Sequence, residues 1–354
     1  MKILYSCSFD LEGYKEGGAT RQKLKILNKY TKLRVISLNG NSFKLLQLLF
    51  IEFKTIVLLL KNKPQVFISR GFVGYFSQKI AKFLKVKTVR EVHADAIEEV
   101  QYYDKNFIEK FFILLLAKLF LTVDLQSDMR IFNHPHLLKW FRSKYFHSKN
   151  DFFCYNGFDF ESKSSLSKKQ ARKKFKFGNK KYLIFTGSSS FWHGVSYLSN
   201  LQKSFNKLNA NIQIVCGGGK VNNSDDPGNI LKNISPLNGK DCADLIMAAD
   251  ACILPARQSR ISPGSPLKLY DYILHKKPVI TVKNLKGYSD EVLKYKNGIL
   301  VDFSKSHKAA KIIINTMKFL HKKKLKTKIN NFSWDQVIFK WIKFINILIK
   351  KNPS

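Results

Sequence analysis

Short apolar runs alternate with helix-length segments along the chain, and this alternation constrains the fold more than any other feature. In the first half the apolar runs are Lys2–Cys7, Leu33–Leu38, Gln65–Ser69 and Thr88–Val92. The pattern then restarts with Tyr182–Thr186, Ile212–Cys216, Ala251–Leu254 and Pro278–Val282. Continuous apolar runs that each precede a helical segment are typical of buried parallel strands. Two such series predict an α/β protein with two doubly wound, Rossmann-like domains.

The same patterns place the domain boundaries. The first domain is expected over residues 1–164 and the second over 165–333, with the Ser/Lys-rich segment Ser162–Lys176 between them. Residues 334–354 carry apolar side chains at helical spacing from Trp334 onward. This spacing predicts a final helix that crosses back to the first domain.

The chain is strongly basic, with 62 Lys and Arg against 25 Asp and Glu and a net charge of +37. Hydrophobic residues make up 45% of it, which excludes a disordered chain. Because no usual nucleic-acid-reading module occurs, a nucleic-acid partner is not expected. Two other interpretations stay open, namely a solvated surface that reflects composition and attraction to an anionic membrane surface.

One segment bears on the membrane interpretation. In Phe43–Lys61 apolar residues recur at helical spacing among lysines, as in helices that lie on membranes. A core helix of the first domain would have the same pattern, so both alternatives remain.

The location is expected to be cytoplasmic, with peripheral association at the inner face of the cytoplasmic membrane as the further possibility. Five cysteines are scattered without paired spacing, which is typical of a reducing compartment. The sequence begins with a strand-like run and no cleavable signal is apparent. The longest apolar stretch, Phe111–Val123, contains Lys118 and is shorter than a bilayer span.

In open α/β sheets ligands bind beyond the carboxyl ends of the strands, so the loops there are the candidate sites. In the first domain, adjacent glycines at Gly17 and Gly18, with Arg21 nearby, allow close approach of the backbone to a ligand. His93 ends a predicted strand and is placed to hydrogen-bond a sugar or phosphate.

In the second domain, a Gly/Ser loop leads from a strand into a helix and contains Gly187, Ser188, His193 and Gly194. Backbone N–H groups at such a helix start can bind a phosphate. The loop lacks the Gly-Lys-Ser/Thr of a P-loop and the glycine spacing of a dinucleotide fingerprint.

The most specific loop is Ser262–Tyr272. Ser265 is an N-cap candidate and Pro266 a favourable first helical residue, so a helix is predicted to begin here. Lys268 then lies in the first turn, where the helix dipole disfavours a cation. A bound anion would compensate for this placement, and Asp271, on the same face, is suited to accept hydrogen bonds from ribose hydroxyls.

Taken in order, these segments resemble the GT-B-fold glycosyltransferases of the family 4-like group. Gly17-Gly18 resembles the family's N-terminal glycine loop, Glu91-Val92-His93 its "EvH" strand end, and Asn156–Asp159 its domain junction. The later matching segments are Trp192–Val195, Cys216–Gly219, Ala248–Pro255, Ser265–Tyr272, Lys277–Ile280 and Phe332–Asp335.

The resemblance implies a retaining transfer from a nucleotide-sugar donor, bound by the second domain, to a glycan or lipid-linked acceptor on the first. Lys268 and the amides of Gly264, Ser265, Pro266 and Leu267 would hold the diphosphate, and Asp271 would bind the ribose. His93 would face the transferred sugar. His93, Lys268 and Asp271 are therefore the implied catalytic residues, and surface polysaccharide or lipopolysaccharide-type biosynthesis is the implied role.

Three positions depart from the family pattern. Pro263 stands where the family has a first glutamate, Asp271 replaces the second, and His193 replaces a lysine. Arg257 or Arg260 is then the candidate substitute cation. No Asp-x-Asp pair occurs, so neither a metal nor another cofactor is expected.

Two alternative functions fit the same sequence. One is a nucleotide-sugar epimerase on the GT-B fold, which would need no acceptor. The other is a module whose catalytic site has decayed and which binds membrane or nucleic acid, because fold alone does not establish activity.

Overall fold

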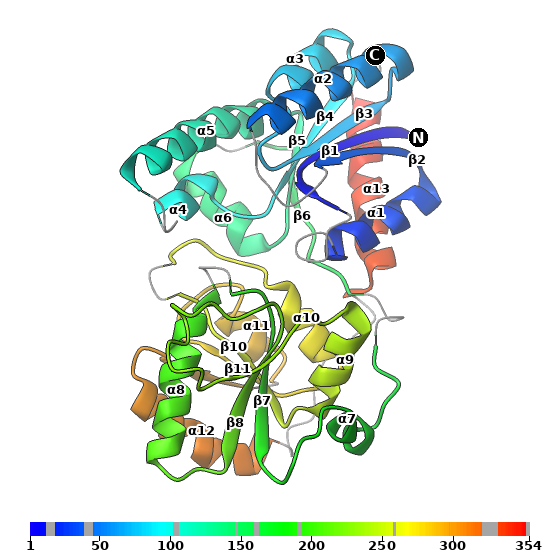
Figure 1. The fold of residues 1–354 in the computed structure, drawn as a ribbon. Coiled ribbons are helices and arrows are strands. Elements are labelled where there is room, and N and C mark those ends of the chain that lie inside the picture. Colours follow the sequence, from blue (N-terminus) through cyan, green and yellow to red (C-terminus); the bar gives the residue numbers. More distant parts are fainter. Residues whose placement is uncertain are drawn as a thin grey trace. The chain divides into compact units, whose positions relative to one another are not determined.

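The computed structural model describes residues 1–11, 18–38, 45–101, 106–145, 148–158, 163–189, 193–257, 260–296, 298–320 and 332–351 (Figure 1). The chain divides into two compact units, residues 1–157 with 334–354 (unit 1) and 158–333 (unit 2). Each unit contains a six-stranded sheet in which every pairing is parallel. The predicted α/β class with two Rossmann-like sheets is confirmed.

The division between the units lies before the predicted boundary at residues 164 and 165. Phe158 forms a parallel bridge with Ser333, and its N–H donates to the carbonyl of Phe332 at 2.9 Å. These backbone contacts attach the chain to unit 2 directly after Gly157. The junction therefore lies between Gly157 and Phe158 rather than in the Ser/Lys-rich segment.

The sheet of unit 1 has the strand order β2-β1-β3-β4-β5-β6. Its strands are β1 (Lys2–Asp10), β2 (Lys32–Leu38), β3 (Val66–Arg70), β4 (Lys87–Val92), β5 (Met129–Phe132) and β6 (Asp151–Phe153). The central strands are buried on both sides, which agrees with their continuous apolar sequences.

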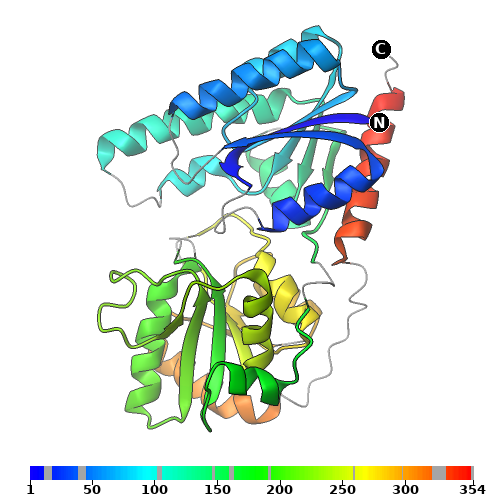
Figure 2. The same cartoon turned by 45° about the vertical axis from the view of Figure 1, so that its right-hand side comes forward.

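Helices cover both faces of this sheet. They are α1 (Gly18–Tyr30), α2 (Leu45–Asn62), α3 (Tyr75–Phe83), α4 (Ala96–Gln101), α5 (Phe107–Gln126), α6 (Pro135–Lys144) and α13 (Trp334–Lys351). One core cluster joins α1 and α13 to the strands, and α13 lies beside α1 in both views (Figures 1 and 2). A second cluster joins α2 and α3 to the opposite face.

The sheet of unit 2 has the order β12-β11-β10-β7-β8-β9. Its strands are β7 (Lys181–Gly187), β8 (Ile212–Gly218), β9 (Lys232–Ile234), β10 (Ala251–Leu254), β11 (Val279–Val282) and β12 (Gly298–Val301). Its helices are α7 (Lys168–Lys174), α8 (Val195–Lys207), α9 (Gly239–Ala248), α10 (Leu267–Leu274), α11 (Ser289–Lys294) and α12 (Ser306–Leu320). Within the described ranges, no helix is long and apolar enough to cross a bilayer.

Candidate functional site

The carboxyl end of β7 in unit 2 is formed by Gly187, whose φ is +123°. A Cβ atom at this position would lie 2.4 Å from Cε of Lys268, which belongs to α10. Only glycine combines this backbone conformation with so close an approach. The fold therefore brings the predicted residues Gly187 and Lys268 together.

Helix α10 begins one residue later than predicted. Its N-cap is Pro266, with ψ of 117°, and no side chain caps the helix. Ser265 is not the N-cap, because its hydroxyl lies 3.2 Å from the hydroxyl of Tyr270 instead. The N–H of Gly264 donates to the carbonyl of Lys286 at 3.1 Å, and Pro266 has no N–H. The amides of Gly264–Leu267 thus cannot all face a ligand.

Lys268 and His193 form a direct contact. Nζ of Lys268 lies 2.8 Å from Nε2 of His193, and Nδ1 of His193 lies 2.8 Å from the carbonyl oxygen of Ser188. A carbonyl only accepts, so Nδ1 carries the proton and Nε2 accepts from the ammonium group. Burial and the charge of Lys268 lower the pKa of His193 to about 3. The imidazole is therefore neutral at pH 7.

Burial also shifts the two ionisable residues of α10 in opposite directions. It lowers the pKa of Lys268 to about 7, against the attraction of Asp271. It raises the pKa of Asp271 to about 7, against the attraction of Lys268. A carboxyl group with so high a pKa repels a neighbouring anion less than an ordinary aspartate does.

The loop after β10 adds a second cation. A Cβ atom at Gly264 would lie 3.2 Å from a terminal nitrogen of Arg260, and the charge of Arg260 further lowers the pKa of His193. Arg257 lies in the same loop, where its carbonyl accepts from the N–H of Arg260 at 3.1 Å. Gly194, with φ of +60°, caps α8 and packs against the backbone of Ala256. These contacts give unit 2 two cations, Lys268 and Arg260, with the neutral His193 beside Lys268.

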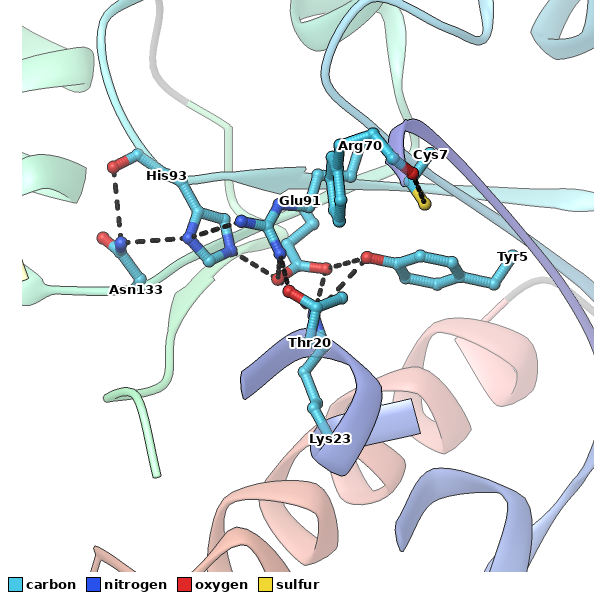
Figure 3. Close-up of polar contacts among 9 residues, drawn as sticks. Tyr5, Cys7, Thr20, Lys23, Arg70, Glu91, His93 and Asn133 are labelled. Atoms are coloured by element: carbon cyan, nitrogen blue, oxygen red, sulfur yellow. Dashed lines mark hydrogen bonds and ion pairs between the residues drawn. The ribbon is translucent and has the colours of Figure 1, made fainter. Parts of the chain in front are cut away.

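In unit 1 the predicted His93 belongs to a buried network centred on Glu91 (Figure 3). Tyr5 donates to Glu91 at 2.7 Å, and Lys23 and His93 both contact the same carboxylate. A terminal nitrogen of Arg70 lies 3.7 Å from it. Burial alone would raise the pKa of Glu91, but the charges of Lys23 and Arg70 hold it well below its usual range.

The hydrogen bonds of His93 define its state. Its Nε2 faces the carboxylate of Glu91, whereas Nδ1 lies 3.4 Å from Arg70 and 3.3 Å from the amide nitrogen of Asn133. The proton therefore lies on Nε2, and Nδ1 accepts. Burial and the charge of Arg70 lower the pKa of His93 to about 4. His93 is therefore neutral, and its two ring nitrogens connect Glu91 with Arg70 and Asn133.

A cavity of about 200 Å³ adjoins this network in unit 1. Arg70, His93 and Asp95 line its polar part, and Phe72, Phe120 and Phe141 are among its apolar residues. The guanidinium of Arg70 stacks over the ring of Phe9 at 4.6 Å and donates to Thr20 at 2.6 Å. These contacts fix Arg70 at the edge of the cavity.

The other residues predicted for the unit 1 site, Gly17, Gly18 and Arg21, are not part of the Glu91 network as far as the structure describes them. Gly17 lies outside the described residues, Gly18 is the first residue of α1, and Arg21 is exposed on that helix. Lys23, two residues beyond Arg21, enters the network instead. Sequence reasoning also passed over Arg70, Glu91 as the central carboxylate, and Asn133. The position of Arg70 at the carboxyl end of β3 was the available signal.

Comparisons with known proteins concern the family of residues 167–333 and the fold. Residues 167–333 match the family described as glycosyl transferases group 1. Sucrose-phosphate synthase from Thermosynechococcus elongatus superposes with a TM-score of 0.77 at 12% identity, covering 99% of this chain and 100% of that one. No curated protein sequence matches the chain.

Two further solved structures resemble the chain over nearly its whole length. WaaG, a glycosyltransferase involved in lipopolysaccharide biosynthesis, gives a TM-score of 0.68 at 13% identity and covers 99% of this chain and 100% of its own. Anabaena HepE in complex with UDP gives 0.69 at 15% identity, with coverages of 98% and 100%. At these identities the similarity establishes a common fold.

Proposed function

We propose that the chain is a glycosyltransferase on the GT-B fold and that it transfers a sugar from a nucleotide-sugar donor to a glycan or lipid-linked acceptor. The match of residues 167–333 to the group 1 family and the shared fold support this proposal. The transfer is proposed to retain the anomeric configuration. Binding of the donor is proposed from the position of Lys268. Its ammonium group lies in the first turn of α10 beside His193 and Gly187.

A diphosphate at the start of α10 would compensate for the unfavourable placement of Lys268. The helix dipole and burial both disfavour an ammonium group there, and an anion reverses both effects. A charge-assisted hydrogen bond to a phosphate oxygen is about twice as strong as a neutral one. Solved structures of Anabaena HepE hold UDP and UDP-glucose, which supports a nucleotide-sugar as the ligand.

The proposed chemistry requires stabilisation of the leaving diphosphate and orientation of the acceptor hydroxyl. Lys268 and Arg260 would neutralise the diphosphate, while Asp271 would hydrogen-bond the ribose. Because the sequence contains no Asp-x-Asp pair, we assign this charge stabilisation to side chains and the helix start rather than to a metal.

The acceptor is proposed to bind the cavity of unit 1. Arg70 offers a charged hydrogen-bond donor there, and the nearby aromatic rings can pack against the faces of a sugar. Asp95 is 2% exposed and already accepts from Trp140, Lys144 and Tyr145, so it shapes the cavity wall. Both ring nitrogens of His93 already have partners, so His93 would hold Arg70 and Glu91 in place beside the acceptor. It acts as a positioning group in this proposal.

We further propose a role in surface polysaccharide or lipopolysaccharide-type biosynthesis, at the cytoplasmic face of a membrane. The similarity to WaaG and the net charge of +37 support this assignment. A nucleic-acid partner is not part of the proposal.

A donor screen tests the proposed activity. Incubation with nucleotide sugars, followed by detection of the released nucleoside diphosphate and of the free sugar or glycoside, should identify one donor. An epimerase would instead isomerise the sugar without any acceptor. A decayed site would show neither turnover nor a thermal shift with any nucleoside diphosphate, and this result would overturn the proposal.

A further inference from the structure

Helix α2 exposes an apolar stripe. The sequence left open whether its regular apolar residues face the core or a membrane. In the structure Leu48, Ile51 and Leu59 face the core, whereas the stripe consisting of Leu46, Leu49, Phe50, Phe53 and Leu60 faces outward. Phe50 and Phe53 are 65% and 66% exposed. A helix that is apolar on both faces normally has a partner on each of them.

Helix α5 has the same property in its first half. Its buried residues, Ala117, Phe120 and Val123, all lie in the second half. The first half exposes Phe107, Ile108, Phe111, Phe112 and Leu115. Helix α3 adds Phe76 and Phe83, which are also exposed. Exposed apolar groups gathered in this way mark an interaction site on a soluble protein.

These three helices lie side by side on one face of the unit 1 sheet (Figures 1 and 2). Helix α3 contacts both α2 and α5, while α1 and α13 pack on the opposite face. The outward residues named above for α2, α3 and α5 therefore belong to one side of unit 1, which we call the three-helix surface.

Lysines accompany the apolar residues of this surface. Lys54 and Lys61 of α2, Lys79 and Lys82 of α3, and Lys118 of α5 are exposed. Among the described residues of these helices, Glu109 is the one acid in the exposed class. Glu52 is buried against the amides at the start of α3, and Asp124 of α5 is paired with Arg90. The combination of bulky apolar groups and lysines suits the interface of an anionic bilayer.

We propose that the three-helix surface docks unit 1 onto an anionic lipid bilayer, with its phenylalanines and leucines in the interfacial layer and its lysines at the headgroups. The helices would lie in the interface, since none of those described can span the membrane. A second copy of this chain is a poorer occupant, because two molecules of net charge +37 repel each other.

This inference names the membrane partner of the proposed function and rests on that proposal for its cellular setting. Helix α5 also contributes Ala117, Phe120 and Leu121 to the unit 1 cavity. Docking through the first half of α5 would therefore hold the candidate acceptor cavity close to the lipid surface. A lipid-linked acceptor suits such an arrangement better than a soluble glycan does.

The test measures binding of the whole protein to vesicles of phosphatidylglycerol and phosphatidylcholine, and of phosphatidylcholine alone, by co-sedimentation. The variants are Phe50→Ser/Phe53→Ser and Phe111→Ser/Phe112→Ser, which leave the net charge unchanged. The control is Phe319→Ser/Phe339→Ser, whose side chains are 60% and 65% exposed on α12 and α13. Thermal unfolding establishes that each variant is folded.

The proposal requires that the protein bind the anionic vesicles and bind the neutral ones much more weakly. Affinity for the anionic vesicles should fall about tenfold or more in each α2 or α5 variant and stay unchanged in the control. It is overturned if the protein does not bind, or if it binds both vesicle types equally. It is also overturned if all variants bind the anionic vesicles equally, because that result would indicate attraction through charge alone. Self-association lost in the α2 and α5 variants, without an effect on lipid binding, would assign the surface to a second copy. Donor turnover is assayed separately without lipid, so either proposal can fail alone.

Discussion

The ammonium nitrogen of Lys268 lies 2.8 Å from Nε2 of His193, and the ring is held in this orientation by its contact with the carbonyl of Ser188. Because the imidazole can only accept at Nε2, it directs one N–H of Lys268 and leaves two others for further acceptors. The contact thus orients a half-buried cation at the start of α10.

Removal of this cation should weaken nucleoside diphosphate binding. Lys268→Ala is expected to cost about 1.5–3 kcal/mol of binding free energy, as for loss of a hydrogen bond between charged groups. Isothermal titration calorimetry measures the effect. The matched control is Lys203→Ala on the exposed face of α8, which should leave the affinity unchanged. Equal affinities of the two variants would exclude Lys268 from the site.

Gly187→Ala should act through Lys268. Its new Cβ would lie 2.4 Å from Cε of Lys268, and the φ of +123° is unfavourable for any other residue, so the lysine must move. The loss of affinity should approach that of Lys268→Ala. In the double variant the two losses should not add, because both remove the same contact. Additive losses would show that Gly187 contributes independently.

Donor-site affinity should decrease as the pH rises above 7. The pKa of Lys268 is lowered to about 7, so the population of its ammonium form falls as the pH passes that value. Asp271, whose pKa is raised to about 7, ionises over the same range and adds repulsion. A bound diphosphate raises the pKa of Lys268, so binding takes up protons there.

Calorimetry in buffers of different ionisation enthalpy measures this proton uptake directly. Lys268→Ala removes the titrating ammonium group and should flatten most of the dependence on pH. Affinity that stays constant from about pH 6 to 9 would contradict the lowered pKa of Lys268.

The central strands could be predicted because each is a continuous apolar run, but β5 and β6 could not. Arg130 in β5 and Asp151 in β6 form a buried ion pair with contacts of 2.6 and 2.9 Å. Opposite charges in neighbouring strands satisfy each other inside the core. A search for apolar runs passes over both strands, since it considers each residue without its partner.

The same limitation explains why the unit 2 part of the candidate site could be predicted and the unit 1 part could not. The start of α10 is a local signal. Two details were wrong there, namely the N-cap, which is Pro266 instead of Ser265, and the expectation that all amides of Gly264–Leu267 face a ligand. The partners of Glu91 are distant in sequence, so neither Lys23 nor Arg70 could be connected with it. Periodicity also could not tell which apolar face of α2 is buried, because both faces are apolar.

Glu91→Gln should destabilise unit 1. Lys23, 2% exposed, would keep its buried charge without a carboxylate, and the loss of one partner of a buried ion pair costs about 3–5 kcal/mol. Lys23→Met/Glu91→Gln removes both charges and should restore part of this stability. Urea denaturation followed by circular dichroism measures the unfolding free energy of each variant.

Acidification provides an independent check on Glu91. Its pKa is held well below the usual range in the folded protein, so the unfolded chain takes up the proton first as the pH falls. The stabilisation is thus complete above the unfolded value of about 4.3 and is lost as the pH falls through the folded pKa. Wild type should therefore lose more stability than Glu91→Gln between about pH 5 and 3. Parallel losses in the two proteins would mean that Glu91 is not the ionised centre of the network.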